Sequence, residues 1–229
     1  MQSKVKLTKR QVKEDKFTTF MLTSKDRLQD ELEDKWQYYV IGLVLIVVII
    51  WAVSWHFSRQ SSREVEAAES LAKAMLSYQV GDNQVASLEF SQIVENYSGS
   101  EAAERATYLL GNINLATRSF DAAIDYYQTY LKDFSGDPVT RAASYAGIAA
   151  ASEDLAQYGQ AADNFNLAAQ EDPKGPLVAD YLYGSLRNYL ADGNVEQARQ
   201  VLNRLEDEYS GSAETRKAQI SFAEHAAGQ

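Results

Sequence analysis

The chain has 229 residues, no cysteine and only two histidines, and its formal net charge is −10. The lack of cysteine excludes disulfide bonds, thiolate nucleophiles and zinc-finger sites, and two histidines leave little room for histidine chemistry. The charge is unevenly spread, because residues 1–35 carry nine Lys/Arg against seven Asp/Glu, whereas residues 59–229 carry thirteen against twenty-five. So acidic a C-terminal segment repels phosphate backbones, and we therefore expect no nucleic acid among the partners.

A segment without any charged side chain follows the N-terminal basic head of residues 1–35 and covers residues 36–58. As a helix it would rise about 34 Å, which is enough to cross a hydrocarbon layer of about 30 Å. We therefore predict a transmembrane helix over 36–58, and an uncleaved anchor is favoured over a cleaved signal peptide because the preceding segment is long. Aromatic side chains are typical of the two membrane interfaces. The predicted interface anchors are Trp36, Tyr38, Tyr39, Trp51 and Trp55.

An internal repeat organises the acidic segment of residues 59–229. Its clearest column is an alanine that recurs with spacings of 37, 38 and 37 residues, each time followed four residues later by Phe, Tyr or Leu. A step of four keeps both positions on one face of a helix. The alanine column consists of Ala86, Ala123, Ala161 and Ala198.

Upstream of each alanine helix the sequence predicts a partner helix, at about 62–79, 101–117, 138–155 and 176–191. A final helix is expected from near Ala213. Columns that keep one period favour a solenoid of stacked units over a single bundle. The predicted fold class is therefore all-α, with an N-terminal transmembrane helix, an α-solenoid of about four helix pairs and a terminal capping helix.

Three similar tetrapeptides, "YSGS" at 97–100, "FSGD" at 134–137 and "YSGS" at 209–212, separate successive helix pairs. We interpret them as hinges between repeats. The glycine can adopt the left-handed conformation that ends a helix, and the following Ser or Asp can cap the next one. At the remaining boundary, "DPKG" at 172–175 is predicted to do the same with a proline.

The second unit resembles the tetratricopeptide repeat (TPR) family most closely, through Leu110-Gly111, Phe120, Ala123, Tyr127 and Leu131. The resemblance extends over about residues 62–210 and implies a protein-binding scaffold. The whole arrangement of basic head, single anchor and acidic array is similar to the ancillary subunit of the bacterial Sec translocon. That similarity, together with the basic head before the span, implies a single-pass protein of the bacterial inner membrane with a cytoplasmic N-terminus and a periplasmic array.

The TPR resemblance also implies that the first helix of each unit lines a concave groove. Arg and Tyr there could grip the backbone and carboxylates of a peptide. For Tyr108 and Tyr183, packing between repeats is an equal alternative. The predicted groove residues are Arg105, Tyr108, Asn112 and Leu115 in the second unit, and Asp180, Tyr183, Arg187 and Leu190 in the fourth.

No set of residues in the sequence predicts catalysis, a metal site or a cofactor, so we expect a non-enzymatic protein. The expected partners are proteins, namely translocon subunits, chaperones or exported clients, together with the lipid bilayer. The leading hypothesis is assistance in protein export or envelope protein biogenesis near the translocon. Two alternatives stay open, a permanent structural subunit of an envelope or secretion complex and a cytosol-facing import receptor of an organelle. The sequence leaves the oligomeric state undetermined.

Overall fold

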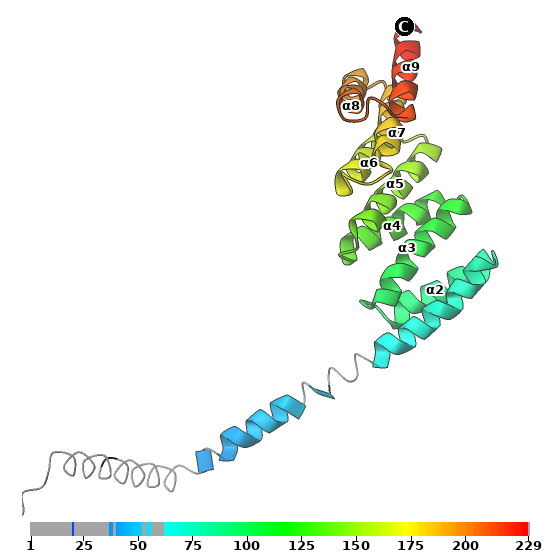
Figure 1. Cartoon of the computed structure of the whole chain (residues 1–229). Helices are drawn as coiled ribbons and strands as arrows, with labels where there is room; N and C mark the ends of the chain where they lie inside the picture. The colour runs from blue at the N-terminus through cyan, green and yellow to red at the C-terminus, as the bar shows by residue number, and fades with distance from the viewer. Residues whose placement is uncertain (1–19, 21–36, 39, 52–53, 56–61, 229) are drawn as a thin grey trace, which may run out of the picture. The chain divides into compact units, whose positions relative to one another are not determined.

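A computed structural model describes residues 20, 37–38, 40–51, 54–55 and 62–228 (Figure 1). The chain divides into two units, Met1–Gln60 and Ser61–Gln229. Apart from Phe20, the predicted basic head lies outside the described residues, as do Trp36, Tyr39 and residues 52–53 and 56–58 of the predicted span.

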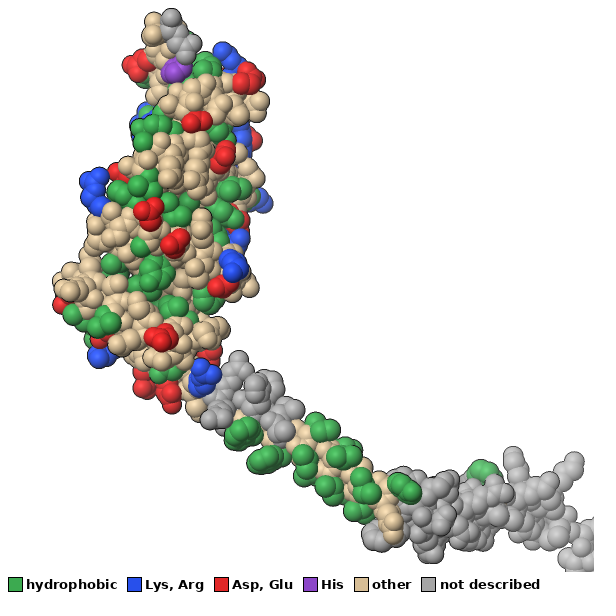
Figure 2. All heavy atoms as spheres, turned by 180° about the vertical axis from the view of Figure 1, so that it is seen from behind, with side chains coloured by type: hydrophobic (Ala, Val, Ile, Leu, Met, Phe, Trp, Pro, Cys, Tyr) green, Lys and Arg blue, Asp and Glu red, His purple; other side chains and the backbone are tan. Residues whose placement is uncertain are grey.

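The described part of the first unit contains an apolar helix over residues 40–51. Its large aliphatic side chains are exposed to between 45% (Val40) and 63% (Leu43), and hydrophobic side chains cover the face of this helix that Figure 2 shows. Tyr38 and Trp55 are also exposed, and the rings of Trp51 and Trp55 stack with their centroids 6.3 Å apart. Within the residues that the structure describes, no helix is both long enough and apolar enough to span a membrane.

The second unit is a stack in which successive helices pack against one another, and the terminal helix also packs against the helix two places before it (Figure 1). Between residues 62 and 228 all regular structure is helical, in four pairs and a ninth, terminal helix. This confirms the predicted all-α solenoid. The helices are 62–79, α2 (Asn83–Asn96), α3 (Glu101–Ala116), α4 (Phe120–Asp133), α5 (Pro138–Asp154), α6 (Tyr158–Glu171), α7 (Val178–Ala191), α8 (Val195–Glu208) and α9 (Ala213–Ala227).

All four alanines of the repeating column are completely buried. In the second and third repeat units, an aromatic ring one turn later fills the space beside the alanine, and glycines on first helices make room for it. Tyr127 of α4 lies between Gly111 of α3 and Gly147 of α5, where added Cβ atoms would come within 2.6 and 2.4 Å of its ring. Phe165 of α6 packs against Gly184 of α7 in a similar way. These contacts explain why a first helix carries glycine in its interior despite the poor helix propensity of that residue.

The tetrapeptides between pairs cap the following helices as predicted. The side chains of Ser100, Asp137 and Ser212 accept hydrogen bonds from backbone N–H groups three residues later, at 3.0–3.1 Å. Gly99 and Gly136 have the expected positive φ, of 80° and 55°.

The prediction of a left-handed glycine is wrong for Gly211, because its φ lies outside the left-handed region. The hydroxyl of Thr215 donates to the carbonyls of Leu205 (3.2 Å) and Tyr209 (2.7 Å). Where a helix ends with a left-handed glycine, backbone N–H groups donate to carbonyls in such positions, and here the hydroxyl does so instead. The 172–175 boundary also differs, since α7 begins at Val178 and its N-cap residue makes no capping hydrogen bond through its side chain.

A second series of turns, within each pair, places one residue in the left-handed conformation five residues before the buried alanine. Two are glycines, with φ of 82° at Gly81 and 79° at Gly193, but Arg118 and Ala156 adopt φ of 61° and 59°. The turn geometry is therefore imposed by the packing of the repeat and not by the identity of the residue.

Candidate functional site

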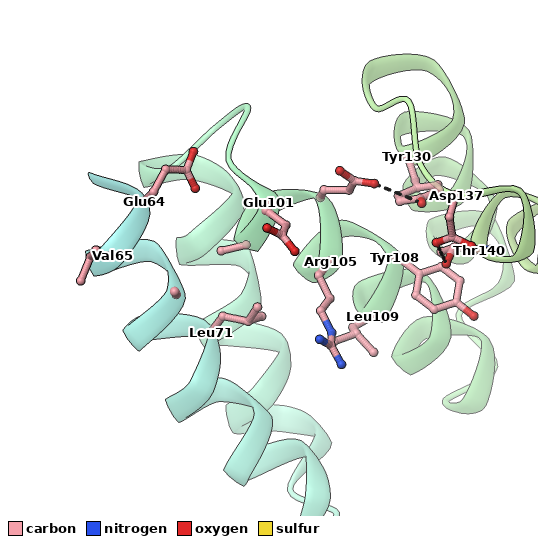
Figure 3. Close-up of a pocket in the computed structure, with 13 residues that line it drawn as sticks. Glu64, Val65, Leu71, Glu101, Arg105, Tyr108, Leu109, Tyr130, Asp137 and Thr140 are labelled. Carbon is pink, nitrogen blue, oxygen red and sulfur yellow. Dashed lines mark hydrogen bonds between the residues drawn. The ribbon is translucent and has the colours of Figure 1, made fainter. Parts of the chain in front are cut away.

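A groove of about 920 Å³ lies between the first helices of successive pairs (Figure 3). Helix 62–79, α3 and the start of α5 supply most of its walls, and Tyr130 of α4 completes them. The lining residues are Glu64, Val65, Ala68, Leu71, Glu101, Ala102, Glu104, Arg105, Tyr108, Leu109, Tyr130, Asp137 and Thr140.

The repeat itself creates this lining. Glu64 and Leu71 on helix 62–79 stand 37 residues before Glu101 and Tyr108 on α3, which is the spacing of the alanine column. Equivalent faces of neighbouring first helices therefore meet in one hollow. Steps of three and four residues keep the lining positions of each helix on the same face.

The floor of the groove is apolar and aromatic. Leu109 is only 8% exposed, and Leu71 is half-buried beside the core of the first two pairs. The ring of Tyr108 lies 6.1 Å from that of Tyr127 and 5.8 Å from that of Tyr130, centroid to centroid. Tyr108 thus packs between repeats and also lines the groove, and its contact with a bound peptide stays a prediction.

The hydroxyl of Tyr130 donates a hydrogen bond to Glu104 at 3.3 Å, drawn as a dashed line in Figure 3. Burial, and next the charge of Glu104, raise the pKa of Tyr130 to about 12. The phenol therefore remains a neutral donor at physiological pH, and the carboxylate of Glu104 is held at the wall of the groove.

Negative charge dominates the groove. Four carboxylates, of Glu64, Glu101, Glu104 and Asp137, surround the single guanidinium of Arg105. Hydrogen bonds from the side chain and the backbone N–H of Thr140 lower the pKa of Asp137, so it is ionised at neutral pH. In the described part of the chain, Glu64, Glu101 and Arg105 form no ion pair.

The predicted residues of the second unit divide into two kinds. Arg105 and Tyr108 line the groove. Asn112 instead accepts a hydrogen bond from the hydroxyl of Tyr127 at 2.7 Å, and Leu115 is half-buried against the cluster around Tyr127. These two residues therefore stabilise the contact between α3 and α4.

The predicted residues of the fourth unit lie on α7, and none of them lines this groove. Arg187 forms an ion pair with Glu153 of α5, with nitrogen–oxygen distances of 2.5 and 2.8 Å. Tyr183 is half-buried, and the ammonium group of Lys217 lies 5.9 Å from its ring centroid. Asp180 is exposed, whereas Leu190 is a core residue with 7% exposure and offers little surface to a ligand.

Sequence reasoning missed the contribution of the first helix and of the hinge before α5. Glu64 and Leu71 could have been found from the 37-residue register, because they occupy the positions of Glu101 and Tyr108. No sequence signal places Tyr130 or Asp137 at the groove, because Tyr130 lies near the end of the second helix α4 and Asp137 is the N-cap residue of α5.

In the residues described, no group of three or more His, Asp or Glu side chains is arranged to hold a metal ion. The groove offers apolar contacts and carboxylates on a rigid helical frame. Such a surface suits the recognition of another chain.

Comparison with known proteins agrees with this architecture. A family model described as tetratricopeptide repeat matches residues 71–138. Two crystal structures of nearly identical TPR-like repeats, from a Podosopora anserina protein described as a kinesin light chain, share 18% sequence identity with this chain. They cover 71% of this chain and 85% and 86% of their own chains, with TM-scores of 0.52. No curated protein matches this chain.

The chain is thus a TPR-like α-solenoid protein, of a class suited to protein–protein interaction. The family match supports tetratricopeptide repeats, and it covers the end of helix 62–79, α2, α3, α4 and the hinge that leads into α5. Most of the groove residues fall inside this stretch.

Proposed function

We propose that this protein is a membrane-anchored, non-enzymatic scaffold whose repeat array binds other proteins. The open groove between helix 62–79, α3 and α5 is the observation that carries this proposal. Its floor is apolar, and its free charged groups lie beside that floor, which is the arrangement of a protein-recognition surface.

The anchor is proposed from the apolar segment of residues 36–58. Its sequence is free of charge over a length sufficient for a bilayer. In the described helix 40–51, every isoleucine, leucine and valine is at least 45% exposed. Lipid chains would remove this apolar surface from water, at about 25 cal/mol per Å².

The finer proposal places the array in the periplasm of a bacterium, where it assists protein export or envelope protein biogenesis near the Sec translocon. Its support is the order of segments in the sequence, a short basic head, one apolar span and an acidic array. Anchoring raises the local concentration of the groove near chains that emerge at the membrane, so weak contacts suffice for capture.

Reporter fusions at Gln229 test the anchor and its orientation. A reporter that is active only in the periplasm should give signal on the full chain and lose it when residues 36–58 are deleted. Activity only from a cytoplasm-dependent reporter would overturn the periplasmic placement. Extraction of the full chain from membranes by carbonate would overturn the anchor itself.

A further inference from the structure

We infer that the groove binds an unfolded polypeptide segment in which Lys or Arg side chains adjoin apolar ones. This inference rests on the proposed function, because it specifies the chemistry of the protein segments that the array takes. The starting observation is the imbalance of charge around the apolar floor, with four carboxylates against one guanidinium.

The carboxylates are spread over three consecutive first helices. Glu64 lies on helix 62–79, Glu101 on α3, and Asp137 is the N-cap residue of α5. A segment that crosses these helices would therefore meet a negative charge at each of them. An extended chain makes such a crossing with its side chains on alternate sides, so that basic residues can reach the rim while others reach the floor.

The two outer glutamates are available for a ligand. Figure 3 shows Glu64 and Glu101 on neighbouring helices at the upper edge of the hollow, with Leu71 and Leu109 below them. Neither glutamate is paired with a cation of the described chain. Complementary charge across an interface guides association and excludes partners of the wrong sign.

The apolar floor of the groove requires that the ligand also carry apolar side chains. Leu71 and the ring of Tyr108, both half-buried, present apolar surface below the charged rim, and the buried Leu109 lies beneath it. A purely polar cationic segment would leave this surface uncovered, whereas apolar side chains of the ligand would bury it. An acidic ligand is disfavoured because Arg105 alone would have to offset four carboxylates.

Fluorescence anisotropy with the purified full chain in a neutral detergent tests the inference. Three labelled decapeptides of equal leucine content would carry lysine, glutamate or glutamine at the same positions. We expect the lysine peptide to bind at least tenfold more tightly than the other two, and its affinity to fall as salt rises from 50 to 300 mM. Equal or tighter binding of the glutamate or glutamine peptide would overturn the cationic preference but leave a protein-binding groove.

Charge-neutral variants locate the binding site. Glu64→Gln with Glu101→Gln should weaken the lysine peptide about five- to tenfold, and Arg105→Gln should strengthen it. The matched control is Glu66→Gln with Glu95→Gln, which removes two exposed charges outside the groove and should change affinity less than twofold. Circular dichroism of each variant verifies the fold.

Two further outcomes would contradict the inference in different ways. Equal weakening by the groove and control pairs would mean that only the net charge of the array attracts the peptide. A change of oligomeric state on removing Glu64 and Glu101, with unchanged peptide binding, would mean that a second copy occupies the groove. Failure of all three peptides to bind would remove the groove from the proposed function, whereas the reporter fusions test the anchor independently.

Discussion

The contact of Tyr127 with two glycines predicts that Gly147→Ala destabilises the array. In the interior of a helix this change usually stabilises by about 0.5–1 kcal/mol. Here the added Cβ would lie 2.4 Å from Cε2 and 2.5 Å from Cζ of Tyr127, well inside ordinary contact distance. The ring has little room to retreat, because its other edge lies so close to the backbone of Gly111 that a Cβ added there would come within 2.6 Å of Cε1.

Forcing the ring aside would also strain its 2.7 Å hydrogen bond to Asn112. Overpacking of a well-packed core typically costs about 1–3 kcal/mol. After the gain of about 0.5–1 kcal/mol in helix propensity is subtracted, we expect a net loss of about 0.5–2 kcal/mol in the free energy of unfolding. In urea unfolding of the full chain in neutral detergent, followed by circular dichroism, the midpoint should shift to lower urea.

A double-mutant cycle separates this contact from other effects. In a Tyr127→Leu background the ring is gone, so Gly147→Ala should cost little or become stabilising. Gly159→Ala in α6 is the control, since the atoms nearest to its new Cβ belong to the movable side chain of Asp192, at 2.9 Å, and this change should not destabilise the array. An equal cost of Gly147→Ala with and without the Tyr127 ring would refute the reasoning.

Three further predictions concern single residues. Ala156→Gly should stabilise the array by about 0.5–1 kcal/mol in urea, because glycine removes the cost of a left-handed φ of 59°; a loss of stability would contradict this. Ser152→Ala and Ser185→Ala should each be neutral or stabilise by about 1 kcal/mol in thermal unfolding, since neither buried hydroxyl has a hydrogen-bond partner among the described residues. Tyr130, whose pKa is raised from 10.0 to about 12, contributes stability that is complete below pH 10 and is lost as pH rises through about 12. Tyr130→Phe should therefore flatten the decline in stability between pH 10 and 12, and an unchanged decline would show that other groups cause it.

The sequence predicted the array well because its signals are periodic. Ala86 and its equivalents are wholly buried, and the final helix begins at Ala213 as expected. A helical repeat buries the same positions in every unit, so a small residue that recurs at one period indicates a buried contact between helices. Chain direction and local capping then determine where each helix begins, as Ser100 and Asp137 show.

The groove was harder to predict because a residue on the expected groove face of a first helix can contact a neighbouring helix instead of facing the groove. Arg187 occupies a position equivalent to Asn112, but it pairs with Glu153, and Asn112 holds the hydroxyl of Tyr127. Leu190 has a helical spacing that would suit the groove, yet it packs into the core. Whether such a side chain faces the groove depends on the residues that the neighbouring helices place beside it, and the sequence of one helix does not show these.

Crosslinking in intact cells tests the central claim, that the groove of a membrane-anchored array binds other proteins. A photoreactive phenylalanine analogue in place of Tyr108 should capture partner chains, whereas the same analogue in place of Glu95, an exposed residue outside the groove, should capture few or none. An excess of the lysine–leucine peptide, added to membranes opened to the array, should reduce capture at the groove position. Equal capture from both positions, unaffected by the peptide, would contradict the account.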